Sequence, residues 1–214
     1  MSAPSPIASP GRVAITLGVL VGSALLLVLT VERGTEPLVA QTRALRLERQ
    51  MAAVLPAPDP GARTVSERLV PIASDEDPVP PRWIERRWVD GRPDALVLNV
   101  IAPDGYSGDI DLLVGIGADG TLHGVRVIRH RETPGLGDDI ERQRSDWITR
   151  FDGLSLDTVP AAGWAVRAHG GHFDAFTGAT ITPAAVVGAV HRALRWVEDH
   201  HRMPERISTG QPER

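Results

Sequence analysis

The stretch GGHFDAFTGATITP, residues 170–183, decides how the last part of this chain folds. Gly170 and Gly171 allow another part of the backbone to approach closely. Thr177 and Thr180 place hydroxyl groups on either side of the small residues between them. The stretch leads into an expected helix, whose N-terminus can hold an anion such as a phosphate. The same features also suit a glycine-rich turn followed by a capped helix that binds nothing.

The helix expected at residues 183–200 is the clearest element in the chain. Its apolar residues recur at intervals of three or four and form one face: Val186, Val190, Leu194 and Val197. Thr182 is a suitable N-cap, and Pro183 occupies the first helical position, where proline is favoured. We therefore expect the positive end of the helix dipole to lie beside the two threonines.

Upstream of this stretch, the pattern favours an α+β fold with a small antiparallel sheet and flanking helices. Runs rich in leucine and β-branched residues predict strands at residues 95–102, 111–116 and 121–129, and residues 163–166 are a further candidate strand. Asp119-Gly120 is a hairpin signal between the second and third of these strands. Residues 138–150 have short helical character. We expect the compact domain to cover residues 82–200.

An apolar segment near the N-terminus, residues 13–31, reads VAITLGVLVGSALLLVLTV and contains no charge. At a rise of about 1.5 Å per residue it spans roughly 28 Å, close to the hydrocarbon core of a bilayer. A buried helix or a cleaved signal peptide are the alternatives, but a signal peptide has a shorter apolar core. We expect an uncleaved transmembrane anchor. Its orientation is not decided by charge, since arginines stand on both sides of it.

The remaining segments are expected to connect or flank these two parts. Residues 1–12 form a short N-terminal tail, residues 32–81 a stalk helix followed by a linker, and residues 201–214 a C-terminal tail. The linker prediction rests on stretches rich in Pro, Asp, Ser and Gly at residues 56–81.

Composition excludes several classes of function. The formal net charge of −4 leaves no basic surface for neutralising phosphates, so we expect no nucleic-acid partner. The chain has no cysteine, which excludes disulfides, thiolate metal sites, iron–sulfur clusters and cysteine nucleophiles. Histidine and carboxylate residues show no ligand spacing typical of a metal site. We expect neither a metal nor a catalytic side chain.

The segment Asp174-x-x-Thr177-Gly178-Ala179-Thr180 matches a known signal, Asp-x-x-Ser/Thr-Gly-Ala-Thr. A flavin transferase reads this signal and esterifies FMN, through its phosphate, onto the last threonine. Carried over to this chain, the acceptor is Thr180, and Asp174 is a recognition residue for the transferase or a partner for a backbone donor. Thr177 stands where many relatives have serine, and the hydroxyl is kept.

Two further stretches extend the similarity. Residues 105–110 (GYSGDI) precede a predicted strand, and residues 130–138 (HRETPGLGD) follow the predicted hairpin. Together with the threonine motif and the N-terminal anchor, they make the chain resemble the G subunit of Rnf ion-translocating oxidoreductases. The similarity to the C subunit of the sodium-translocating NADH:quinone reductase is weaker. The resemblance covers roughly residues 94–197.

The resemblance implies a covalently bound FMN in a domain that faces the periplasm. The chain would be held in the bacterial inner membrane by one helix, with its N-terminus in the cytoplasm. It would relay electrons within a translocase that exchanges electrons between ferredoxin and NAD, without substrate turnover of its own. Its partners would be the other membrane subunits and a flavin transferase. Nine residues would bind or surround the flavin: Thr180, Asp174, Thr177, Gly178, Ala179, Glu132, Thr133, Gly135 and Leu136.

Three other interpretations remain open. The first is the C subunit of the quinone reductase. The second is a stand-alone FMN-binding module of the cell envelope that acts as a redox shuttle or sensor. The third is an anchored adaptor with no enzymatic role, in which the threonine motif only caps a helix. A covalent flavin would exclude the third.

Overall fold

The computed structural model of the chain describes residues 10–71 and 79–200. These residues belong to two units, Met1–Arg46 and Leu47–Arg214, each of which is described by itself. The predicted C-terminal tail, most of the predicted N-terminal tail and part of the predicted linker lie outside the described residues.

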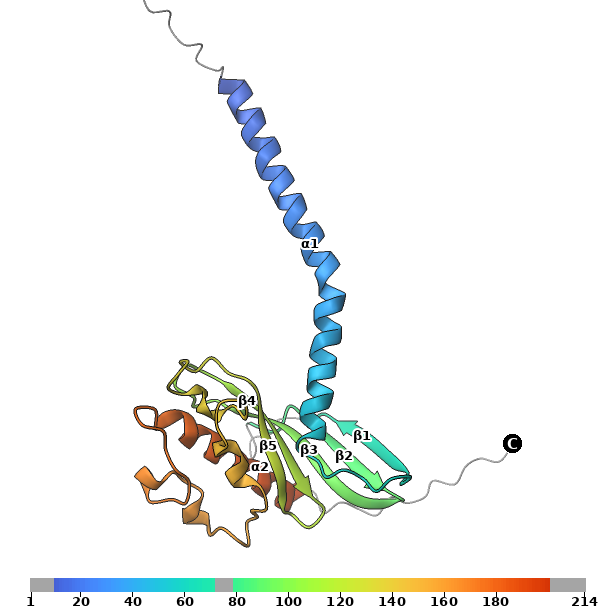
Figure 1. Cartoon of the computed structure of the whole chain (residues 1–214), viewed down its shortest axis with the longest axis vertical. Helices are drawn as coiled ribbons and strands as arrows, with labels where there is room; N and C mark the ends of the chain where they lie inside the picture. The colour runs from blue at the N-terminus through green and yellow to red at the C-terminus, as the bar shows by residue number, and fades with distance from the viewer. Residues whose placement is uncertain (1–9, 72–78, 201–214) are drawn as a thin grey trace, which may run out of the picture. The chain divides into compact units, whose positions relative to one another are not determined.

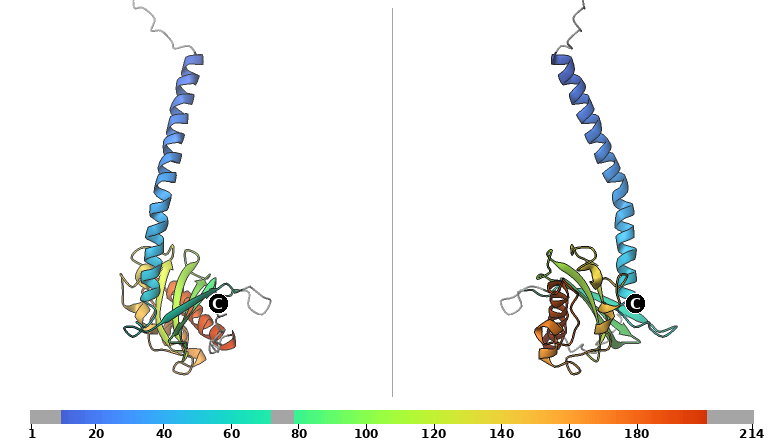
Figure 2. Two further views of the ribbon diagram at one scale, coloured as in Figure 1. Left: turned by 90° about the vertical axis from the view of Figure 1, so that its right-hand side faces the viewer. Right: turned by 60° about the vertical axis from the view of Figure 1, so that its left-hand side comes forward.

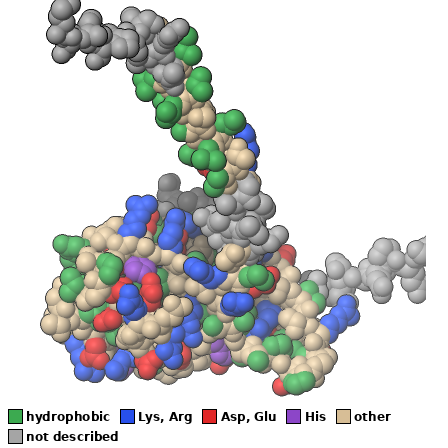
Figure 3. All heavy atoms as spheres, turned by 45° about the horizontal axis from the view of Figure 1, so that its top comes forward, with side chains coloured by type: hydrophobic (Ala, Val, Ile, Leu, Met, Phe, Trp, Pro, Cys, Tyr) green, Lys and Arg blue, Asp and Glu red, His purple; other side chains and the backbone are tan. Residues whose placement is uncertain are grey.

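Helix α1 (Pro10–Ala52) begins the described chain and contains the segment predicted as a membrane anchor, residues 13–31. Its described apolar side chains between Ile15 and Val31 are exposed (Figure 3). No helix in the described parts of the chain combines the length and the apolar character that crossing a bilayer requires. The structure therefore gives no support to the predicted anchor. The predicted stalk helix is part of the same continuous helix.

The second unit is built on one five-stranded antiparallel sheet (Figure 1). The strands lie side by side in chain order. The strands are β1 (Thr64–Leu69), β2 (Trp83–Val89), β3 (Arg92–Ala102), β4 (Ile110–Gly117) and β5 (Leu122–Arg129). The expected α+β domain with an antiparallel sheet and flanking helices is confirmed. Sequence reasoning found β3, β4 and β5 but missed β1 and β2, and β1 lies within the segment predicted as linker.

Tight turns join β2 to β3 and β4 to β5. Asp90 and Gly91 have φ values of 51° and 79° between the paired residues Val89 and Arg92. Positive φ at both central residues is the geometry of the two-residue turn that matches strand twist. The predicted Asp119-Gly120 hairpin is also present, but its connection between β4 and β5 is four residues long.

One face of the sheet is covered by α2 (Ile181–His200), and Figure 2 shows this layering from two sides. The predicted apolar face of the helix is buried against the sheet in a single core: Val186, Val190, Leu194 and Val197 pack with Leu96, Leu98, Leu112 and Val114. α2 begins at Ile181, two residues before the predicted start. The predicted helix at residues 183–200 is otherwise confirmed.

Four short 3-10 helices complete this side of the second unit: η1 (Asp138–Ile140), η2 (Trp147–Phe151), η3 (Ala161–Gly163) and η4 (Arg167–His169). The helical character predicted for residues 138–150 corresponds to η1 and the first part of η2. The predicted strand at residues 163–166 is wrong. Val166 makes only a single bridge to Phe173, because the segment is confined between the end of η3 and the start of η4.

The opposite face of the sheet is covered by the end of α1 and the residues that follow it. Val54 is fully buried against Val97 and Leu113. A Cβ on Gly115 would lie 1.8 Å from the carbonyl oxygen of Val54, so glycine on β4 is what allows this close approach. The predicted domain start at Arg82 therefore lies inside a unit that already needs residues near Val54.

Candidate functional site

A cavity of about 470 Å³ opens at the N-terminal end of α2. It is bounded by the loop after β3, the loop after β5 and the segment that leads into the helix. The lining residues are Tyr106, Glu132, Thr133, Leu136, Gly137, Gly178, Ala179, Thr180, Ile181 and Thr182. Three segments that are separate in the sequence thus meet at one place.

Glu132 joins these three segments. It is almost fully buried, and its carboxylate accepts a hydrogen bond of 2.9 Å from the backbone N–H of Ser107. The hydroxyl of Thr182 donates to the other carboxylate oxygen. A buried carboxylate is stable only where hydrogen bonds replace its hydration. Glu132 therefore fixes the loop after β3 and the first turn of α2 to its own loop.

The loop at residues 133–138 is a compact turn that forms one wall of the cavity. The backbone N–H groups of Leu136 and Gly137 both donate to the carbonyl of Thr133, at 3.1 and 3.0 Å. Gly135 has a φ of 77°, which favours glycine, and its N–H donates to the Asp138 carboxylate at 2.6 Å. This turn leaves the Leu136 side chain 46% exposed at the cavity.

A second wall is the turn that contains the threonine motif. The N–H of Ala179 donates to the carbonyl of Phe176 at 3.1 Å, and Gly178 between them has a φ of 80°. A Cβ at Gly178 would meet only the Leu136 side chain, at 3.9 Å, so the space beside this turn is open. The carbonyl of Thr180 accepts from the N–H of Ala184. Thr180 therefore stands directly at the start of α2.

The structure brings six of the nine predicted site residues into the cavity: Glu132, Thr133, Leu136, Gly178, Ala179 and Thr180. Gly135, Asp174 and Thr177 do not line it. Gly135 shapes the turn that presents Leu136, and the Asp174 carboxylate forms ion pairs with Arg150 and Arg167 instead.

Sequence reasoning missed four lining residues: Tyr106, Gly137, Ile181 and Thr182. The single tyrosine of the chain, within the stretch GYSGDI, was a usable signal for the first. Thr182 was expected to cap the helix through its hydroxyl, but that hydroxyl donates to Glu132. The sequence carries no local sign of this contact, since the two residues are 50 positions apart.

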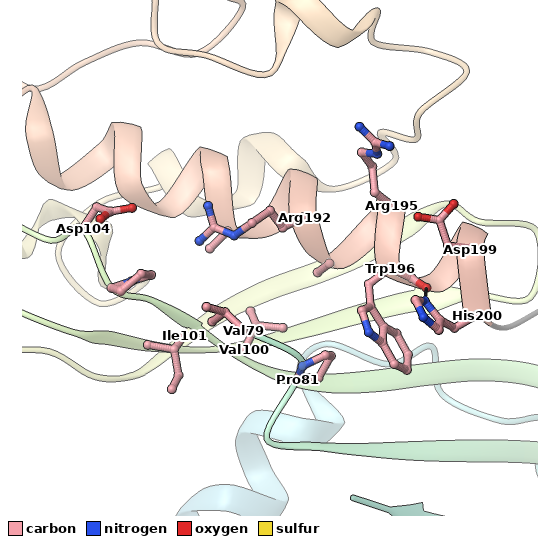
Figure 4. A pocket seen from close by; sticks show the side chains of 13 residues that line it. Val79, Pro81, Val100, Ile101, Asp104, Arg192, Arg195, Trp196, Asp199 and His200 are labelled. Atoms are coloured by element: carbon pink, nitrogen blue, oxygen red, sulfur yellow. Dashed lines mark hydrogen bonds between the residues drawn. The ribbon is translucent and has the colours of Figure 1, made fainter. Parts of the chain in front are cut away.

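A second cavity, of about 450 Å³, lies between the end of β3 and the C-terminal half of α2 (Figure 4). Asp104 stands at one end of it, and Arg192 projects from α2 between the two ends. At the other end the rings of Trp196 and His200 stack, with centroids 4.7 Å apart. None of the predicted site residues lines this cavity. Among the described residues, no group of three or more histidine or carboxylate side chains is arranged to hold a metal.

Comparison with known families identifies the class of domain. Residues 105–195 match the model of the FMN-binding domain family. This range contains every residue that lines the cavity at the start of α2. The fold is therefore that of an FMN-binding domain, and the cavity lies within the matched range.

Comparison with curated proteins identifies the family more closely. The chain is 42% identical over 194 residues to the G subunit of the ion-translocating oxidoreductase complex of Pseudomonas aeruginosa (strain UCBPP-PA14), covering 87% of this chain and 88% of the relative. Proteins of the same name from Escherichia coli (strain K12) and Vibrio cholerae (strain ATCC 39541) are 60% and 51% identical. These two matches cover 49% and 53% of this chain, and 50% and 54% of the respective relatives. The chain belongs to the family of G subunits of ion-translocating oxidoreductase complexes.

Proposed function

We propose that this chain carries FMN as a phosphoester on Thr180 and relays electrons within an ion-translocating oxidoreductase complex of the Rnf type. The observation that carries the proposal is the position of Thr180. It is a hydroxyl residue that lines a cavity and directly precedes the N-terminus of a 20-residue helix. An anionic phosphoester there lies at the favourable end of the helix dipole and near unpaired backbone N–H groups.

The cavity suits a flavin in size and in lining. Its volume lies within the range of roughly 300–1,000 Å³ that is typical of small-molecule sites. Tyr106, Leu136 and Ile181 are apolar or aromatic side chains that remain 70%, 46% and 52% exposed at it. Such surfaces are what a flat ring system would cover. The open space beside Gly178 allows the flavin to approach the backbone next to the acceptor threonine.

FMN, when bound, supplies the electron-transfer chemistry. The residues of this chain hold and orient it. Thr180 provides the covalent bond, which prevents loss of the cofactor by dissociation. Thr133 and Leu136 form one wall of the cavity, and the hydrogen bonds of Glu132 hold that wall beside the first turn of α2. Because charges and hydrogen bonds around the ring are the protein's means of setting a potential, the buried Glu132 carboxylate is the group best placed to do so.

Attachment of the flavin needs an activated donor, because a hydroxyl does not condense with a phosphate monoester in water. A flavin dinucleotide meets this need. The bond from Thr180 Oγ to phosphorus forms as the pyrophosphate bond breaks, the nucleoside monophosphate leaves, and the hydroxyl proton passes to a base of the transferase.

The proposal also places the chain at the inner membrane, with the flavin domain in the periplasm. Support comes from the uncharged apolar sequence of residues 13–31, and from the resemblance to a family of membrane-complex subunits. This placement predicts that attachment of flavin requires the transferase to be present in the periplasm.

The experiment is co-expression of the full chain with a flavin transferase, followed by denaturing gel electrophoresis under ultraviolet light. The wild-type band should fluoresce when the transferase is exported and stay dark when it is kept in the cytoplasm. Thr180→Val should be dark. Thr133→Val is the matched control, because it removes a hydroxyl from the same cavity but leaves the acceptor, and its band should fluoresce.

Each arm of this experiment has a result that contradicts the proposal. If the wild-type band is dark while a control substrate of the transferase is labelled, the proposal of a covalent flavin is contradicted. A fluorescent Thr180→Val band would move the attachment to another residue. Labelling by a cytoplasmic transferase alone would overturn the periplasmic location.

A further inference from the structure

Asp174 belongs to the motif of the acceptor loop but does not reach the cavity. Its carboxylate is held between two arginines, with Arg167 at 2.9 Å from one oxygen and Arg150 at 3.6 Å from the other. The arginines come from different elements, η4 and η2. The carboxylate therefore connects the loop to both 3-10 helices at once.

The backbone around Asp174 is held by the same two elements. The indole N–H of Trp147, on η2, donates to the carbonyl of Asp174 at 2.8 Å. The N–H of Arg167, on η4, donates to the carbonyl of Phe173 at 2.6 Å. Phe173 is buried and stacks on Phe151, with ring centroids 4.7 Å apart. The base of the loop is thus fixed, while Thr177 and Gly178 beyond it are exposed.

The side chains of Arg150 and Arg167 are 59% and 65% exposed, and that of Asp174 is 37% exposed. Ion pairs at such positions contribute little to global stability. Burial of Phe173 and the backbone hydrogen bonds hold the fold there without them. What the ion pairs add is a defined direction for the chain as it leaves the anchored base toward Thr180.

We infer that Arg150 and Arg167 are positioning residues for flavin attachment, because they hold Asp174 and so fix the loop that presents Thr180 to the transferase. The inference rests on the covalent attachment proposed above. It assigns Asp174 a role inside its own domain. The alternative is that the transferase contacts the Asp174 carboxylate directly, in which case the arginines compete with the enzyme.

The test measures the initial rate of flavin attachment to the full-length chain in detergent, with purified transferase and FAD, by in-gel fluorescence. Asp174→Asn and the double variant Arg150→Gln/Arg167→Gln should each attach flavin about tenfold more slowly, the scale set by two exposed ion pairs. Adding Asp174→Asn to the double variant should cause no further loss, because residues that act as one unit are not additive.

Two controls separate this role from a general loss of structure. Arg150→Lys/Arg167→Lys keeps both charges and should attach flavin within about twofold of the wild-type rate, on the same ion-pair scale. Arg142→Gln breaks an exposed ion pair with Asp146, and neither residue belongs to the loop, so its rate should be unchanged. Thermal unfolding of every variant should follow that of the wild type.

The outcomes are distinguishable. Wild-type or faster attachment in the Gln double variant, with a slow Asp174→Asn, would overturn the inference and favour direct contact by the transferase. The inference would also be overturned if adding Asp174→Asn to the double variant slowed flavin attachment by as much again as Asp174→Asn does alone. If the wild-type chain itself carries no flavin, the proposed covalent attachment is contradicted instead.

Discussion

At the scale of single residues, Glu132 shows how a side chain can organise a site without needing to touch a ligand. Its two carboxylate oxygens satisfy the N–H of Ser107 and the hydroxyl of Thr182. A Cβ on the neighbouring Gly137 would lie 2.9 Å from the Cβ of Glu132 and 3.0 Å from the Thr182 hydroxyl oxygen. The absence of a side chain at Gly137 is therefore part of the same arrangement.

Replacing Glu132 by alanine should lower the free energy of unfolding by roughly 2–4 kcal/mol, because it leaves two donors without their acceptor at a buried place. Urea unfolding followed by circular dichroism measures this change. Glu141→Ala is the control, since Glu141 pairs with His130 at 2.7 Å from a more exposed position, 38% exposed. A loss for Glu132→Ala no greater than that of the control would contradict the assigned role.

The residues of the site differ in how far sequence could predict them. Gly178, Ala179 and Thr180 stand in one short motif, so their arrangement is local and was predicted. Tyr106 and Thr182 enter the cavity only because the sheet and α2 bring distant segments together. Glu132 was predicted as a wall of the flavin site. Its hydrogen bonds to both flanking segments follow from tertiary structure that no local pattern encodes.

At the scale of elements, α2 carries a histidine whose protonation should affect stability. The ring of His191 stacks on Trp164 with centroids 5.5 Å apart and nearly parallel planes. Partial burial lowers the pKa of His191 below its usual 6.5, and the positive charges of Arg195 and Arg192 lower it further. The folded state therefore favours the neutral ring.

This shift fixes the sign of a pH effect. Below about pH 6.5 the unfolded chain binds a proton at His191 that the folded chain does not bind. The contribution of His191 to the free energy of unfolding is therefore complete above that pH, and it is lost as the pH falls toward the folded-state pKa. Between pH 7.5 and pH 5, the free energy of unfolding should fall less for His191→Gln than for the wild type. Urea midpoints at the two pH values provide the comparison, and equal decreases would rule the effect out.

The elements that sequence missed have physical features in common. β1 is an edge strand that pairs with β2 and whose side chains are largely exposed, so it lacks the apolar run that marks β3 and β4. β2 contains Arg87, which is buried because it pairs with Asp94 and donates to the carbonyl of Pro56. Asp90-Gly91 was a strong hairpin signal that would have located β2, but the pattern around it was too polar to suggest a strand.

At the scale of the whole molecule, the limits of the folding unit depend on contacts made before the first strand. Val54 is fully buried against Val97 and Leu113, with Leu47 and Met51 packed around them. A chain that began at Arg82, where composition predicted the domain to start, would leave this face of the sheet uncovered. It would also remove β1 and leave the edge of β2 unpaired.

A chain shortened to residues 47–214 should therefore unfold cooperatively, whereas residues 82–214 should unfold at a lower temperature. Burial of a single large apolar side chain contributes about 1.5–3 kcal/mol, so loss of the cluster around Val54 costs roughly 5 kcal/mol, comparable to the whole stability of many domains. For a domain of this size that corresponds to a fall of roughly 10–20 °C in the melting temperature. Differential scanning calorimetry of both chains tests this, with Val54→Ala in residues 47–214 as an intermediate case. Equal melting temperatures for the two chains would mean that the sheet does not depend on the end of α1, and that the boundary at Arg82 is the correct one.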